Sequence, residues 1–393
     1  MVKRRCNCGL RKAGKRRRKV EDTSSTTDRL SHLPEPIIYH ILSFLDTKSA
    51  VRTSKLSRSW SRVWKHVPVL DLRSSALRGL VRLEKFVCKV LSLRYDLNVR
   101  KVSYIDDVGY GFQRHESMMV RVIKYAFSHR VQHLVVDTGY DSNHDDTHRF
   151  SFLFGPIKNC DHLETLELGS VTLDSGFGYS GFRMLTTLNV RACMLDTDQG
   201  DDLDLFCNFP YLRNLILSDC FLPCTKSEGN LRVCGPELDN LELNAMDQFK
   251  IEIFTPKLTY LNVRQDLDSL GFSKLTLPSL DHADIGMLKV PGYDSDKFKA
   301  QMQQNLTSLF HGVHNARSLK LHGCSVEIVD DVCEFLKQQP PPFKRLECLI
   351  VGSDSLPKEL IDCFFKGSSC QEPSIVYDLK VVVDNFATVS DFG

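Results

Sequence analysis

The apolar positions of this chain follow two different periods, and the change of period divides it. Between residues 28 and 72 they recur at spacings of three and four, which is typical of helices that bury one face. After residue 73 they follow the pattern LxxLxL, with Ile, Val or Ala in place of some leucines, and this alternation is that of a strand. The sequence therefore predicts a small helical module followed by a series of short strands.

The helical module is predicted to contain three helices. The first carries the apolar stripe Ile37, Ile38, Ile41, Leu42 and Leu45. Asp46-Thr47 ends this helix and caps the second. A third helix is predicted over residues 57–65, with the apolar residues Trp60, Val63 and Trp64 at helical spacing. So small a module buries little surface, and its apolar face either packs against the next domain or is reserved for a partner.

The strand pattern recurs eleven times, at start-to-start distances of 20–36 residues. Clear copies begin at Leu163, Leu185, Leu212, Leu238 and Leu258, weaker ones at Val131, Leu280, Ala316 and Leu346, and degenerate ones at Val67 and Val99. Three copies are followed by a cysteine, Cys193, Cys220 and Cys324, where the chain would turn out of the strand. This signature is that of leucine-rich repeats, which stack into a curved solenoid with parallel strands on the concave face.

Alternation along these strands places every second side chain on the concave face. The set proposed for contact with a partner is Glu167, Asn189, Arg191, Ile216, Glu242, Asn244, Asn262, Arg264 and Lys320. The set mixes both signs of charge and has no aromatic ladder, which suits a protein partner better than a phosphate backbone. The alternative is that most of these side chains are only solvated.

Composition excludes several classes of protein. The 393 residues are 42% apolar and 25% charged, with a net charge of +2, which excludes a disordered or collagen-like chain. No apolar run is long enough to span a bilayer, and no apolar stretch follows the basic N-terminus, so we expect neither a membrane span nor a secretory signal. The 14 cysteines include no CxxC pair, and we expect reduced intracellular thiols that are mostly buried.

The first 20 residues carry ten Lys and Arg and no acid. The basic residues fall into two clusters, Lys3, Arg4 and Arg5 and then Lys15, Arg16, Arg17, Arg18 and Lys19. Two such clusters resemble a bipartite nuclear localisation signal bound by an import receptor, and they predict a nuclear protein, with the cytoplasm as a second location. The alternatives are non-specific attraction to nucleic acid, which the rest of the chain does not favour, or a solvated arm without a role.

Two segments resemble ligand sites but lack the context that such sites need. Gly176, Gly178 and Gly181 form GxGxxG, yet they run almost directly into the next strand pattern, where a dinucleotide site requires a helix. Residues 141–148 are rich in Asp and His but lack the Gly and Glu of a calcium loop. We therefore predict no catalytic residue, no metal and no cofactor.

The helical module resembles an F-box of the plant type that precedes leucine-rich repeats. The matching residues are Asp28-Arg29-Leu30-Ser31, Leu33-Pro34, Ile37, Ile41 to Leu45, Thr47-Lys48, Ala50-Val51, Thr53-Ser54, Leu56-Ser57, Trp60 and Trp64. The resemblance implies docking to the Skp-type adaptor of a cullin–RING (SCF) ubiquitin ligase. It assigns to that interface Leu33, Pro34, Ile37, Ile41, Leu42, Leu45, Val51, Leu56, Trp60 and Trp64. Some of these residues would serve only to hold the helices together, and the alternative for Trp60 and Trp64 is that they pack toward the repeats.

The predicted architecture is thus α/β, with a three-helix F-box and a curved solenoid. Its parts are a basic arm and linker (1–27), the F-box (28–72), the repeats (73–355) and a C-terminal cap of the solenoid (356–393). The predicted function is that of a non-catalytic substrate receptor of an SCF ubiquitin ligase. The alternatives are a nuclear repeat scaffold without ligase function and, less favoured, a small-molecule co-receptor.

Overall fold

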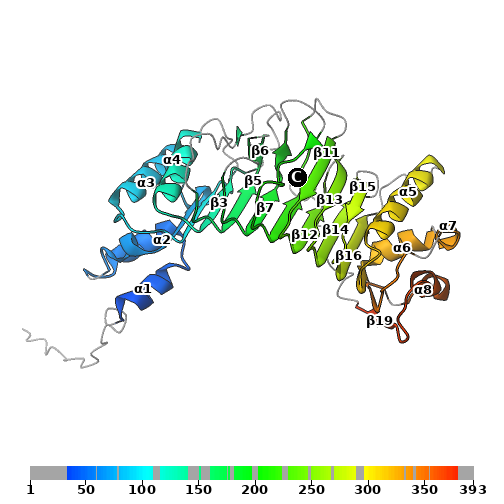
Figure 1. The fold of residues 1–393 in the computed structure, drawn as a ribbon. Helices are drawn as coiled ribbons and strands as arrows, with labels where there is room; N and C mark the ends of the chain where they lie inside the picture. The colour runs from blue at the N-terminus through cyan, green and yellow to red at the C-terminus, as the bar shows by residue number, and fades with distance from the viewer. Residues whose placement is uncertain are drawn as a thin grey trace, which may run out of the picture.

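The computed structural model describes residues 33–378, apart from gaps at 59, 78, 109–115, 140–149, 152–159, 175, 178–180, 197–201, 224–228, 247–248, 267–269, 289–295, 332, 340–341 and 354. The chain forms an arch of stacked repeats with the helical module at its N-terminal end (Figure 1). The module contains α1 (Glu35–Leu42), α2 (Thr47–Arg52) and the 3₁₀ helices η1 (Thr53–Lys55) and η2 (Val63–His66). The remaining helical elements are η3 (Ser74–Ala76), α3 (Leu80–Leu93), α4 (Glu116–Ser128), α5 (Asp296–Gly312), α6 (Gly323–Asp331), α7 (Cys333–Lys337) and α8 (Lys358–Phe365).

One parallel sheet lines the concave side of the arch (Figure 1). Its twelve strands, in spatial and chain order, are β1 (Val69–Arg73), β2 (Lys101–Ile105), β3 (His133–Asp137), β5 (Thr165–Gly169), β7 (Thr187–Arg191), β10 (Asn214–Ser218), β12 (Asn240–Asn244), β14 (Tyr260–Asp266), β16 (His282–Leu288), β17 (Ser318–Leu321), β18 (Cys348–Val351) and β19 (Ser374–Tyr377). This arrangement confirms the predicted α/β class with a parallel concave sheet.

Two smaller parallel sheets form a second layer. One contains β4 (Phe150–Ser151), β6 (Val171–Leu173) and β8 (Met194–Leu195), and the other β15 (Leu270–Thr276), β13 (Phe249–Phe254), β11 (Gly229–Cys234) and β9 (Asp202–Leu203). The core lies between these layers, where the inward-facing side chains of the concave strands meet those of the outer strands.

The LxxLxL pattern locates the concave strands to the residue. In each of the eleven copies, the third residue is the first residue of a concave strand. The copy at Val67 gives β1, and the copy at Leu346 gives β18. In β5, for example, Leu166 and Leu168 are buried between partly exposed Thr165 and Glu167. Neighbouring copies align in register, so that Leu215 of β10 lies beside Leu188 of β7 and Leu241 of β12. The leucines therefore form continuous buried rows through the stack.

A recurrent turn follows the central strands. The residue after each of β5, β7, β10 and β12 has a positive φ although none is glycine: Ser170 (57°), Ala192 (50°), Asp219 (54°) and Ala245 (47°). The backbone N–H of each of these residues donates to a carbonyl of the next repeat, as in Ala192 N to Ser218 O at 2.8 Å. These bonds hold a conformation that costs an L-residue about 1–2 kcal/mol.

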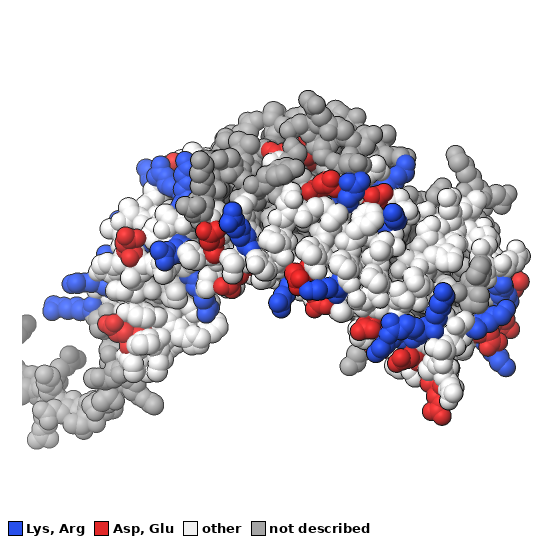
Figure 2. Space-filling model, viewed as in Figure 1, with Lys and Arg blue, Asp and Glu red and all other residues white. Residues whose placement is uncertain are grey.

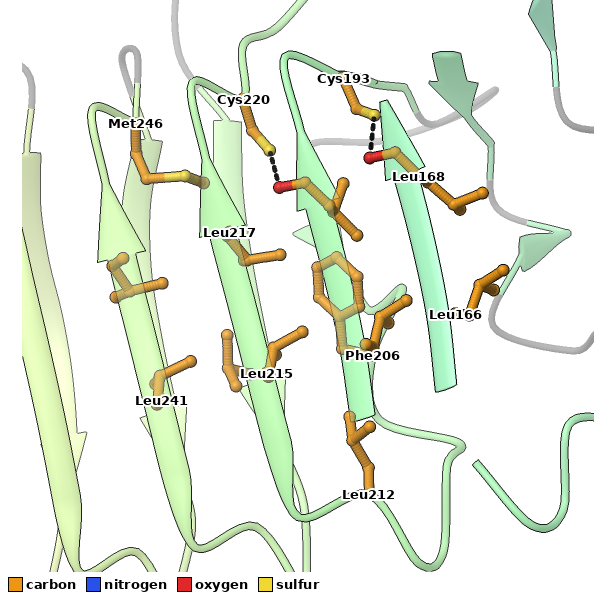
Figure 3. Close-up of a cluster of buried hydrophobic side chains, with 14 of the residues drawn as sticks. Leu166, Leu168, Cys193, Phe206, Leu212, Leu215, Leu217, Cys220, Leu241 and Met246 are labelled. Atoms are coloured by element: carbon orange, nitrogen blue, oxygen red, sulfur yellow. Dashed lines mark hydrogen bonds between the residues drawn. The ribbon is translucent and has the colours of Figure 1, made fainter. Parts of the chain in front are cut away.

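The cysteines after β7 and β10 lie in the core. Cys193 and Cys220 are fully buried, and Met246 occupies the same place one repeat later (Figure 3). Their thiols approach backbone carbonyls of the preceding repeat, Cys193 Sγ to Leu168 O and Cys220 Sγ to Val190 O, each at 3.7 Å (Figure 3). Burial raises the pKa of the Cys220 thiol well above its ordinary value, which keeps it protonated. The third copy differs, because Cys324 lies in the first turn of a helix, α6, whose Val326 is buried.

The F-box region differs from the prediction at its third helix. Turns occupy much of the segment expected to be helical over 57–65, and only Val63–His66 form a 3₁₀ helix. The serines of this segment bond to nearby backbone: Ser57 Oγ accepts from Trp60 N at 3.4 Å, and Ser61 Oγ donates to Arg58 O at 2.7 Å. Such local bonds compete with the helical ladder and explain the difference.

The module is joined to the first repeats through buried and hydrogen-bonded contacts. One continuous apolar core runs from Ile38 through the module into the repeats. Thr47 Oγ1 accepts from Asp71 N in β1 at 2.9 Å, and Arg94, after α3, donates to Trp64 O at 3.2 Å and to Val67 O. At the other end, β19 adds a strand to the sheet from within the segment predicted to be a cap.

Candidate functional site

Apolar side chains are exposed on the helical module in unusual number. Of the 14 large apolar side chains exposed in the described part of the chain, five lie between residues 37 and 56. They are Ile37 (47%), Ile41 (40%), Phe44 (77%), Leu45 (38%) and Leu56 (65%). A cluster of this kind at one end of a folded chain is typical of a protein-binding surface. We call these five residues the apolar patch.

The patch exists because α1 is apolar on two sides. Ile38 and Leu42, four residues apart, face the core, at 4% and 1% exposure. Ile37 and Ile41, also four residues apart, are exposed. Asp46 ends this segment by capping α2, its Oδ1 accepting from Ser49 N at 2.8 Å. A helix with one buried stripe needs only one of these rows, so the second row is available for a partner.

Of the ten residues predicted for docking, seven lie at the surface of the chain and three are buried. Pro34, Ile37, Ile41, Leu45 and Leu56 are exposed, and Leu33 and Val51 are half-buried. Leu42, Trp60 and Trp64 are instead buried, because they pack into the core that joins the module to the repeats. Phe44 was missing from the predicted set although it is the most exposed member of the patch. Phe44 lies two residues beyond the end of α1 and continues the exposed row of Ile37 and Ile41 at helical spacing, which is a signal that the prediction did not use.

Comparison with known proteins identifies the module and the repeats together. Residues 30–72 match the F-box domain family. An F-box/FBD/LRR-repeat protein of Arabidopsis thaliana is 28% identical over 81% of this chain and 71% of its own length. The chain therefore contains an F-box and is similar to F-box/LRR-repeat proteins over most of its length. The F-box implies a Skp-type adaptor as a binding partner.

Two further F-box proteins of Arabidopsis thaliana match a larger and a smaller share of this chain. F-box/LRR-repeat protein 13 is 26% identical over 94% of this chain and 79% of its own length. An FBD-associated F-box protein is 31% identical over 64% of this chain and 56% of its own length. The likeness therefore extends over both the F-box and the repeats.

The concave face carries the nine residues predicted to meet a partner. All nine lie on concave strands at the positions that alternate with buried leucines. Arg191 is exposed and most of the others are half-buried, but Asn262 is buried at 6% exposure. In the view of Figure 2, acidic and basic side chains are interspersed along the concave edge, without a single-sign stripe.

Asp284, Lys320 and His322 form a polar cluster on this face. His322, just after β17, bonds through Nε2 to Asp284 Oδ1 at 2.6 Å, and Lys320 Nζ lies 3.3 Å from Asp284 Oδ2. Burial alone raises the pKa of Asp284, but the hydrogen bonds and charges of His322 and Lys320 outweigh burial and hold this pKa below its ordinary value.

The lowered pKa makes a prediction about acid stability. A carboxylate whose pKa is lower in the folded than in the unfolded chain stabilises the fold above its unfolded pKa, and this contribution is lost as pH falls through the folded pKa. We expect Asp284→Asn to cost about 1–3 kcal/mol at pH 7, and the difference from wild type to shrink below about pH 4. Urea unfolding from pH 2.5 to 7 measures both, with exposed Glu84→Gln as the control. A pH-independent difference would contradict the role assigned to the carboxylate.

The two segments that resemble ligand sites have different outcomes. In the GxGxxG segment Gly176 N donates to Asp174 Oδ1 at 2.9 Å, and Phe177 is fully buried, 5.6 Å from the ring of Phe209. The next described element is strand β7, so this segment lacks the helix N-terminus of a dinucleotide site. Residues 141–148 lie outside the described residues. Among the residues that the structure does describe, no three His, Cys, Asp or Glu side chains are grouped to hold a metal.

The basic arm also lies outside the described residues, as do Asp28-Arg29-Leu30-Ser31 of the F-box. The structure therefore does not bear on the import signal at Lys3 to Arg5 and Lys15 to Lys19. None of the helices within the described ranges combines the length and the apolar character needed to cross a membrane.

Proposed function

We propose that this protein is the substrate-receptor subunit of an SCF-type, cullin–RING ubiquitin ligase. The single observation that supports this most strongly is the apolar patch on an F-box whose buried side is already packed against the repeats. The patch supplies the large apolar anchors that the centre of a protein interface requires. The adaptor would cover the patch and connect the chain to the cullin and RING subunits.

The repeats would hold the target. Their concave face offers half-buried polar and charged side chains on a rigid sheet, which is suited to a specific protein partner. The chain itself would contribute no catalytic group. Its contribution to ubiquitin transfer would be proximity, since holding a target beside the charged enzyme raises the effective concentration of the target lysines.

Reconstitution tests this function. The full chain, co-expressed with a Skp-type adaptor, is expected to elute with it as a one-to-one complex that also recruits cullin and RING subunits. Proteins bound by the repeats should then be ubiquitinated only when the chain is present. Capture of the same proteins without any ubiquitin transfer, and without change in their abundance when the F-box is removed, would favour a non-ligase scaffold instead.

Substitutions on the concave face should separate target binding from adaptor binding. We expect Glu242→Lys combined with Lys320→Glu to lower target ubiquitination about tenfold or more, because reversed charges disfavour the original partner. Adaptor affinity should not change, since β12 and β17 are remote in the sequence from the F-box. The measurement is ubiquitination of the captured targets, with exposed Glu84→Lys combined with Lys124→Glu on α3 and α4 as the charge-matched control.

We also propose that the basic arm directs the protein to the nucleus. Replacing Lys15, Arg16, Arg17, Arg18 and Lys19 by alanine should move a fluorescent fusion of the full chain from nucleus to cytoplasm. The neutralised cluster can no longer bind the acidic grooves of an import receptor. Alanine at Arg52 and Lys55 serves as a control in the folded module. An unchanged nuclear share in the arm variant would contradict the proposal.

A further inference from the structure

The small net charge of the chain conceals a strongly basic folded segment. Residues 33–130, which hold the F-box and the first two repeat strands, contain 18 Lys and Arg against 8 Asp and Glu, a net charge of +10. Their positive charge is additional to that of the N-terminal arm. Figure 2 shows Lys and Arg side chains projecting from the end of the molecule that holds this segment.

Some cations of this segment are used inside the protein. Lys48 donates to the carbonyl of Ala76, and Lys65 lies 5.6 Å from the ring centre of Tyr95. Arg94 donates to two carbonyls of the module. These three side chains connect the F-box to the repeats.

The acids in the described part of the F-box likewise have partners in the protein. Glu35 Oε2 accepts from the hydroxyl of Tyr39 at 2.7 Å, and Asp46 caps α2. Asp71 lies 3.1 Å from Arg73. These acids therefore do not neutralise the remaining cations of the module.

Four cations of the module remain without such a partner. Arg52, Lys55, Arg58 and Arg62 are exposed, and their side chains form no salt bridge with any residue in the described ranges. Lys55 directly precedes Leu56, the patch residue that is 65% exposed, and Arg58 follows two residues later. We call these four residues the basic rim. An apolar centre with a charged rim is the ordinary arrangement of a protein interface.

We propose that the basic rim is part of the docking surface of the F-box and that it fits an acidic face of the Skp-type adaptor. This inference rests on the proposed function and adds the electrostatic character of the partner. A phosphate backbone would fit less well, because Lys55 and Arg58 flank exposed Leu56, which a nucleic-acid backbone would not cover.

The rim has a kinetic consequence. Complementary charges at the edge of an interface accelerate encounter and change affinity less, and salt screens this effect. The association rate of the full chain with the adaptor should therefore fall as ionic strength rises. The apolar patch, in contrast, should determine the dissociation rate and depend little on salt.

The test compares two fourfold variants of the full chain with the same loss of charge. The rim variant carries Arg52→Gln, Lys55→Gln, Arg58→Gln and Arg62→Gln. The control variant carries Arg82→Gln, Lys85→Gln, Lys89→Gln and Lys124→Gln, four exposed cations of α3 and α4. Association with a purified Skp-type adaptor is followed by surface plasmon resonance between 20 and 500 mM salt. All eight sites are exposed, so both variants should fold, which circular dichroism checks.

We expect the rim variant to associate about tenfold more slowly than wild type at low salt and to lose most of the salt dependence. The control variant should associate at close to the wild-type rate. Equal slowing in both variants, or no slowing in the rim variant, would overturn the inference while leaving the proposed function intact. Loss of duplex-DNA binding in the rim variant, with adaptor rates unchanged, would also overturn it. If the wild-type chain did not bind the adaptor at all, both proposals would fail.

Discussion

Replacement of Ile41 and Phe44 together by aspartate is expected to abolish adaptor binding. Both side chains are exposed in the free chain, at 40% and 77%, so the new carboxylates remain in water and the fold is preserved. In the complex the same carboxylates would be buried without a partner, beside the residues that we expect to anchor the interface. We expect the two substitutions together to raise the Kd of the complex with the adaptor at least about 100-fold. Calorimetry with the purified adaptor measures this change.

A matched pair of substitutions controls for added charge. Val81→Asp and Val108→Asp replace side chains that are 62% and 48% exposed outside the F-box. This variant should bind the adaptor with wild-type affinity. An intact complex with the Ile41 and Phe44 variant would show that the patch is not the docking surface, even though the module matches the F-box family.

The concave sheet could be predicted from the sequence because the signal for it is local. In an LxxLxL copy the second and third leucines fall on the same side of a strand, and each repeat buries them against its neighbours. Even the degenerate copies at Val67 and Val99 precede strands, β1 and β2. The pattern fails only at β19, where Glu372-Pro373 stands in place of the apolar start. That strand is placed by pairing with β18, which no local pattern records.

Other features depend on contacts between distant residues and could not be predicted in the same way. The stripe on α1 contains Ile37, Ile38, Ile41 and Leu42 without showing which pair faces the core. In the structure Ile38 and Leu42 face the core, and α1 packs on η2, the 3₁₀ helix that contains Trp64. On the concave face, the strand register places Asn262 between Glu242 on one neighbouring strand and Asp284 on the other. Asn262 is buried although its side chain is polar. Neighbouring strands are only about 4.8 Å apart, so their side chains crowd one another.

Substitution of Trp64 by alanine should destabilise the F-box without removing any part of the docking surface. Trp64 is 6% exposed and belongs to the core that joins the module to the repeats. Loss of a buried tryptophan costs about 3–5 kcal/mol. With a typical dependence on urea, this lowers the unfolding midpoint of the module by about 1 M or more. Binding of the adaptor by the folded protein should keep wild-type affinity, because the apolar patch remains.

The position of the tryptophans allows this loss to be localised. Both tryptophans of the chain lie in the F-box, so tryptophan fluorescence follows the module while far-ultraviolet circular dichroism follows the whole chain. In Trp64→Ala, the unfolding midpoint followed by the fluorescence of Trp60 should fall by more than the midpoint followed by circular dichroism. Tyr211→Ala, at a side chain 56% exposed on the repeats, should change stability by less than about 0.5 kcal/mol. A Trp64→Ala chain of wild-type stability that no longer binds the adaptor would instead place Trp64 in the interface.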